Sequence, residues 1–246
     1  MLSVLALLIV SQPIVDHSFV QGELVVEELA PEVSAFGHVW PEESQYESLL
    51  ALILLRKPFR VAEMITEPLH GGESSVVIDK WVPGGSCNVV ATKVVQRVRS
   101  RTVALTNEHK AWPMAREEYP VTTASVPLGA EDCASLVELW VAALNAVRPL
   151  KDLYGKYTFV DPGIGDKIHF GSYQGSVGYM TGRAFMPAMS PKLRALRAVG
   201  DGLEAYVTSS DAMEVRLLRL RVQIRSARTL FGITVHNPKQ PPRQQD

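Results

Sequence analysis

The sequence predicts a single α+β domain that is rich in antiparallel strands and contains two or three helices. Its 246 residues, 46% hydrophobic and 21% charged, have the composition of a folded protein with a sizeable buried core. The predicted strands come in runs instead of alternating with helices, and no internal repeat or linker divides the chain. We expect an N-terminal arm over residues 1–40, one α+β domain over 41–236 and a polar tail over 237–246.

The N-terminal arm contains two short patterns. Val4 to Val10 is an apolar run like that of a signal peptide, although no Lys or Arg precedes it and its length is minimal. The run is far too short to span a bilayer, which takes about 20 residues. Residues 21–29 predict a strand with acidic neighbours, followed by a loop.

Two segments have the spacing of amphipathic helices. The first begins with Pro-Glu-Glu at positions 41–43, which places a proline and two acidic residues in the first turn. Its last turn, residues 49–55, is apolar on nearly every side, so we expect the core or another subunit to cover it. The second helix is predicted over 131–147, where apolar residues form one stripe and acidic residues occupy the first turn.

Segments rich in β-branched residues predict the sheet. The Pro-Gly-Gly sequence at positions 83–85 indicates a hairpin turn between the first two of them. The predicted strands are residues 76–82, 88–98, 102–105, 121–126, 157–160, 168–172, 176–180 and 231–235.

The C-terminal third contains one ambiguous segment. A short helix is predicted over 191–199, ending near Gly200 and Gly202. Residues 218–225 then alternate strictly between apolar and polar side chains, which predicts a strand. A helix is the rival interpretation, because helical spacing also fits Met213, Leu217, Leu220 and Ile224.

The two cysteines, Cys87 and Cys133, suggest a hypothesis about compartment. One disulfide between them suits an oxidising environment, whereas two free thiols are ordinary in a reduced protein. Cys133 lies on the apolar face of a predicted helix, where a buried, inert thiol is the usual state. Both interpretations stay open. Free thiols would suit an assembly-associated or cytoplasmic location, and a disulfide would suit export.

No motif predicts catalysis, a cofactor or a metal. Gly163-Ile164-Gly165 lacks the third glycine and the following helix of a dinucleotide fingerprint. Asp166 and His169 are three residues apart, so a strand would point them to opposite faces of the sheet. The Ser- and Gly-containing stretch 171–178 does not match Gly-x-Ser-x-Gly, and the six histidines lack metal-site spacing. We therefore assign no catalytic, cofactor-binding or metal-binding residue.

Charge is distributed unevenly along a chain whose formal net charge is −1. Residues 1–75 have a balance of −8 and residues 181–246 a balance of +6, which suits subunits that meet acidic face to basic face. Compensation within one fold explains the same asymmetry. If 218–225 is a strand, one exposed face could contact nucleic acid or an acidic partner through Arg216, Arg219, Arg221, Arg225 and Arg228. A solvated sheet face is the alternative.

These observations favour a non-enzymatic structural or protein-interaction subunit of a larger assembly, such as a capsid or multi-protein complex, with other protein subunits as partners. The first alternative is an exported envelope or periplasmic protein that forms the Cys87–Cys133 disulfide and binds a small ligand or partner. A third hypothesis is a hydrolase whose site forms only on folding, around His169, His109 or a serine with a carboxylate.

Overall fold

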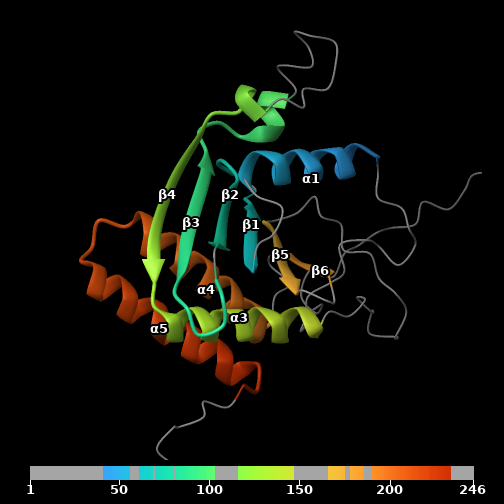
Figure 1. Cartoon of the computed structure of the whole chain (residues 1–246). Helices are drawn as coiled ribbons and strands as arrows, with labels where there is room; N and C mark the ends of the chain where they lie inside the picture. Colours follow the sequence, from blue (N-terminus) through green and yellow to red (C-terminus); the bar gives the residue numbers. More distant parts are fainter. Residues whose placement is uncertain are drawn as a thin grey trace, which may run out of the picture.

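The chain folds as an α+β domain in which helices cover both faces of one antiparallel sheet, as seen in a computed structural model (Figure 1). This arrangement confirms the predicted fold class. The structure describes residues 41–55, 61–68, 70–79, 81–102, 116–146, 166–174, 178–185 and 190–233.

The sheet contains six strands within the described residues, in the order β4-β3-β2-β1-β5-β6. Their bounds are β1 Ala62–Glu67, β2 Ser74–Asp79, β3 Cys87–Val94, β4 Val121–Leu128, β5 Lys167–Gln174 and β6 Gly178–Phe185. Each neighbouring pair is antiparallel. The first four strands therefore form a meander, and the β5–β6 hairpin extends it on the far side of β1.

Helices form a layer on each face of this sheet. Helix α1, Pro41–Leu54, covers one face together with Val98, at the start of the helical residues 98–102, and Tyr119, which follows the short helix η1, Arg116–Glu118. Helices α3, Ala130–Asn145, and α4, Pro191–Thr208, cover the other, and helix α5, Met213–Leu230, packs against these two helices. Alternate residues of each strand face the two layers, as Met64 and Ile65 of β1 show.

The larger core lies between the sheet and helices α3 to α5. Trp140 of α3 packs edge-on against Phe170 of β5, with ring centroids 5.7 Å apart. The Trp140 indole N–H donates to the backbone oxygen of Glu63, 3.0 Å away, so this large side chain is buried without an unpaired donor.

Several predicted elements are confirmed. The structure has helices at α1 and α3, where the sequence predicts them, and strands at β4 and β5. The predicted Pro-Gly-Gly hairpin joins β2 to β3, although β2 ends at Asp79, before the apolar residues 81 and 82.

The strand predicted over 88–98 is too long. Strand β3 ends at Val94, and residues 98–102 are helical, so no strand begins at Thr102; the rest of the strand predicted over 102–105 lies outside the described residues. The chain turns here because buried Glu73 accepts a hydrogen bond from the Val98 backbone N–H at 2.8 Å. A contact across 25 residues overrides the local β propensity.

Helix α4 is twice as long as predicted, because it continues through Gly200 and Gly202. Ser190 caps its start by accepting a hydrogen bond from the Leu193 N–H, 3.1 Å away. The glycines allow close packing: a Cβ on Gly200 would lie 2.1 Å from Met64 Sδ, and one on Gly202 would lie 1.9 Å from a Gln223 side-chain oxygen.

The segment predicted as a strand over 218–225 is helical, so the rival interpretation is correct. Leu220, Ile224 and Ala227 form its buried stripe, while Leu218 and Val222 face outward. Arginine and leucine are both strong helix formers, and the helix extends well beyond the alternating segment. Residues 231 and 232 form a turn where the final strand is predicted to begin, and positions 234 and 235 of that prediction lie outside the described residues.

The remaining sequence predictions lie outside the described residues. They concern the runs 4–10 and 21–29, the strand 157–160, the glycines at 163 and 165, His109 and the polar tail.

Candidate functional site

The outer face of α5 carries most of the large hydrophobic side chains that are exposed in the described part of the chain. Of eight large hydrophobic residues that are exposed there, five belong to this helix: Met213, Val215, Leu218, Val222 and Leu230. The other three are scattered at Leu52, Val82 and Val95.

Three of these α5 residues form a continuous stripe. Val215, Leu218 and Val222 are spaced i, i+3 and i+7, so they share one side of the helix. Leu218 is 64% exposed and Val222 57% exposed, although both are aliphatic. We call these three residues the α5 stripe. Single exposed hydrophobic residues are ordinary, whereas a contiguous apolar stripe makes this side of α5 the candidate interaction surface of the described residues.

The five arginines that the sequence singled out all lie on or at the edges of this helix, but they do not share one face. Positions 216 and 219 lie on a different side of α5 from 221, 225 and 228, since successive residues are separated by about 100°. The prediction of one arginine-lined sheet face therefore fails with the strand on which it rested.

Four of these arginines have partners within the chain. Arg216 donates to the Tyr206 backbone oxygen at 2.7 Å, and Arg219 pairs with Asp211 at the start of the helix. Arg221 and Arg228 bind residues of α3: Arg221 holds Asp132, and the buried Arg228 holds Glu138 and the Ser135 backbone oxygen.

Arg219 and Arg225 remain exposed beside the α5 stripe. The helix itself contains five arginines and one acidic residue, Glu214, but carboxylates outside the helix pair with Arg219, Arg221 and Arg228.

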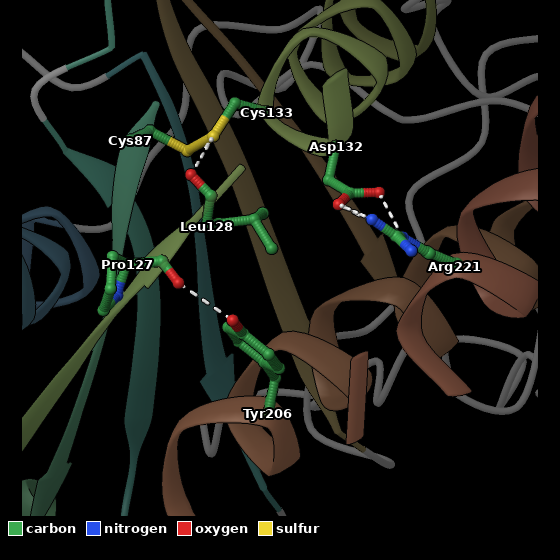
Figure 2. Close-up of a disulfide and its surroundings, with 7 residues drawn as sticks. All are labelled: Cys87, Pro127, Leu128, Asp132, Cys133, Tyr206 and Arg221. Carbon is green, nitrogen blue, oxygen red and sulfur yellow. Dashed lines mark hydrogen bonds and ion pairs between the residues drawn. A yellow bond between two sulfur atoms is a disulfide. The ribbon is translucent and has the colours of Figure 1, made fainter. Parts of the chain in front are cut away.

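Figure 2 shows a disulfide between Cys87, at the start of β3, and Cys133, in the first turn of α3. Both cysteines are buried, with Cα atoms 6.1 Å apart. The Cys133 sulfur also lies 3.3 Å from the backbone oxygen of Leu128. This approach is a contact and not a hydrogen bond, because a disulfide sulfur carries no proton.

The disulfide lies beside the contacts that hold α4 and α5 against the rest of the fold (Figure 2). Asp132, next to Cys133 in the chain, accepts a two-pronged hydrogen bond from the Arg221 guanidinium, with two N–O distances of 2.9 Å. Tyr206 of α4 donates to the Pro127 backbone oxygen at 2.8 Å. Strands β3 and β4 and all three helices of this layer are thus joined at one corner.

A buried ion pair lies on the α1 face of the sheet. His169 Nε2 of β5 is 2.5 Å from Glu67 Oε1 of β1, and both residues are 8% exposed. Burial raises the pKa of Glu67, but the hydrogen bond and charge of His169, helped by Lys167 and Arg99, outweigh burial and lower the pKa. Asp166, the partner considered from sequence, pairs with Arg197 of α4 instead.

Buried Glu73 extends this polar region toward α1. It accepts hydrogen bonds from the Tyr46 hydroxyl at 2.6 Å and from the Val98 N–H, and the Arg97 guanidinium lies 3.9 Å away. The pKa of Tyr46 is raised by burial and then by the negative charges of Glu67 and Glu73. Glu67 and Glu73 are each paired with a hydrogen-bond donor or a group of opposite sign, which is typical of a structural network.

Within the described residues, Ser172 is not placed as a nucleophile beside the His169 imidazole. Ser172 of β5 donates to the Val61 backbone oxygen and, as an even-numbered residue, faces the opposite side of the sheet from His169. The described residues contain no group of three or more His, Cys, Asp or Glu side chains that could hold a metal ion. No helix within the described ranges has the length and hydropathy to cross a membrane.

Comparison with known proteins adds no relative: no family model, curated protein or solved structure matches this chain.

The sequence alone missed the α5 stripe and the His169–Glu67 pair. The alternation over 218–225 predicts a strand with Leu218, Leu220, Val222 and Ile224 on one face, whereas the helix exposes Leu218 and Val222 and buries the other two. The ion pair joins residues 102 positions apart, and only the β1–β5 pairing brings them together.

Proposed function

We propose that this protein is a non-enzymatic protein-interaction subunit and that the α5 stripe is its contact surface for a protein partner. The observation that carries this proposal is the concentration of exposed aliphatic side chains on one helix, in contiguous helical spacing.

The alternative explanation, that α5 is simply a poorly covered helix, is opposed by how firmly the helix is held. Leu220, Ile224 and Ala227 are buried in the core, and Arg221 and Arg228 anchor the helix to α3. The stripe lies on the opposite side of this rigid helix, which is the arrangement required of a helix face that receives a partner.

The charges beside the stripe define the partner's chemistry. Arg225 is exposed on one side of Leu218 and Val222, and Arg219, in an exposed pair with Asp211, lies on the other. We propose an acidic amphipathic segment as the partner, with aliphatic or aromatic side chains over the stripe and carboxylates near the arginines. Such binding would weaken as the salt concentration rises, because exposed charges are screened within about 10 Å at 0.1 M salt.

Site-specific photo-crosslinking in the native source tests the surface directly. A photoreactive amino acid at position 218 should yield one dominant protein adduct, and the same amino acid at position 82 should not. Val82 is a matched control because it is 62% exposed, close to the 64% of Leu218, but it lies outside α5.

The adduct should disappear when Val222→Glu is added to the variant with the photoreactive residue at 218, since a carboxylate would then occupy the stripe. Equal adducts at positions 82 and 218, or none at either, would contradict the proposal. An adduct mapped to a basic segment of the partner would overturn the proposed partner chemistry alone.

The buried disulfide favours a second candidate, that the protein is exported and works in an oxidising compartment. Intact mass measurement on unreduced protein from its own source tests this candidate. A chain lighter by two hydrogens than the reduced form would support export, and a fully reduced chain would oppose it.

A further inference from the structure

Strand β4 forms one edge of the sheet and has a single neighbour, β3, among the described strands. Residues 122–125 are exposed, so neither helix layer covers the middle of the strand. An edge strand of this kind presents a row of backbone donors and acceptors that another strand can use.

The hydrogen-bond pattern shows which residues present those groups. Val95 N donates to the Pro120 oxygen at 3.0 Å, and this pair continues the β3–β4 register by one position. Because bonded pairs alternate in an antiparallel ladder, Thr122 and Ala124 direct their backbone groups toward β3. Val121, Thr123 and Ser125 therefore direct their N–H and C=O groups toward the open edge.

Pro127 limits this open edge at one end. The backbone of Pro127 also points toward the open edge, so the N–H that proline lacks would not have bonded to β3. Its carbonyl is already occupied by the Tyr206 hydroxyl. Pairing by a further strand is thus confined to the three outward positions before it.

The side chains of β4 are unusual for an unprotected edge. The sequence VTTASVPL contains no charged residue, whereas natural sheets commonly place lysine or another charge on such a strand. The exposed side chains are small and neutral, so a strand of the same sequence can lie beside this one without repulsion between like charges.

We propose that β4 pairs with β4 of a second copy of this chain, in antiparallel orientation across a two-fold axis at Thr123. This register sets Thr123 opposite its own counterpart and Val121 opposite Ser125. The backbone groups at all three outward positions then bond to the second copy. Each of the three residue pairs exchanges two hydrogen bonds, roughly six in total. The two six-stranded sheets become one continuous sheet.

A second copy fits this edge better than a charged partner does. The axis places Thr123 against Thr123, a favourable cross-strand pair, and it leaves Pro127 beyond the paired region. An acidic partner, such as the one proposed for α5, would find no basic residue on β4 to bind. This inference rests on a different surface and is independent of the proposed function.

The test measures the dimer dissociation constant of the full-length, oxidised protein by sedimentation equilibrium over a range of concentrations. Thr123→Lys and Thr123→Glu each place two like charges opposite one another at the axis, so each variant alone should dimerise at least about tenfold more weakly. An equimolar mixture of the two should recover dimer as a mixed species, visible by native mass spectrometry.

Thr123→Val is the matched control, because it keeps the shape and the backbone groups and should dimerise like the original protein. Thr123→Pro removes the N–H that points toward the open edge but breaks no hydrogen bond to β3. This variant should therefore be monomeric, with an unchanged circular dichroism spectrum. Leu218→Glu on α5 should leave the dimer intact, which separates this inference from the proposed function.

A chain that is monomeric at every accessible concentration would overturn the inference. Dimers of Thr123→Lys, Thr123→Glu and Thr123→Pro that are as tight as those of the original protein would also overturn it.

Discussion

Loss of the Cys87–Cys133 disulfide is expected to destabilise the fold strongly. The two cysteines are separated by 46 positions, so the bond closes a long loop in the unfolded chain. The chain-entropy relation gives about 4 kcal/mol for a loop of that length at 25 °C. Because both cysteines are buried in the core, reduction leaves two small apolar thiols in place and isolates the effect of the bond itself.

Urea unfolding of the oxidised and the reduced protein, followed by tryptophan fluorescence, measures this effect. With a urea dependence of about 2.5 kcal/mol per molar, the midpoint should fall by roughly 1.5 M on reduction. The double variant Cys87→Ala, Cys133→Ala should unfold at or below the midpoint of the reduced protein and should not respond to reductant.

The reasoning would be refuted if oxidised and reduced proteins unfolded at the same midpoint although a thiol assay showed one bridge before reduction and none after it. Two free thiols in protein purified without reductant would instead show that the bridge is absent.

Four further substitutions test the packing and the polar network. Gly200→Ala should lower the free energy of unfolding by about 1 kcal/mol, because the new methyl group meets a buried methionine and the gain in helix propensity only partly compensates. Gly202→Ala, which meets the end of a half-exposed glutamine, should be nearly neutral, and equal urea midpoints for the two variants would contradict this account. Tyr46→Phe should cost about 1–3 kcal/mol, because buried Glu73 loses a hydrogen-bond donor; an unchanged melting curve would show that the bond is dispensable. Because folding lowers the pKa of Glu67 from its usual value of 4.5, ionised Glu67 stabilises the folded state at pH values above 4.5. This contribution to the free energy of unfolding is lost as the pH falls from 4.5 through the lower pKa of the folded state. Urea midpoints between neutral and acid pH should therefore decline less steeply in Glu67→Gln, and identical slopes would argue against the His169 pairing.

Local sequence patterns predicted the elements whose signals are local. The first helix and the helix after residue 130 carry apolar residues at helical spacing with acidic first turns, and the structure has helices at both. The hairpin at 83–85 follows from its Pro-Gly-Gly turn. These features depend on neighbours within a few residues, which a single sequence displays.

Long-range contacts determined what the sequence could not show. Local rules predict that Gly200 and Gly202 end a helix. In the structure both glycines lie inside one helix, where they allow Met64 and Gln223 to pack closely. The alternation over 218–225 fits two periods, and only the core contacts of Leu220 and Ile224 select the helix.

The candidate surfaces depend even more on tertiary structure. The open edge of β4 exists only because the strand order places β4 last, and no sequence pattern gives that order. The cysteine pair was foreseen as a hypothesis because only one intramolecular pairing is available to two cysteines.

The corner shown in Figure 2 has a mechanical consequence for any molecule bound to α5. A pull on that helix passes through the Arg221–Asp132 pair into the first turn of α3. From the adjacent Cys133 it continues along a covalent bond to Cys87 at the start of β3. Tension on α5 is thereby transmitted to the sheet over two residues of α3, so a partner on α5 would be tethered to strand β3.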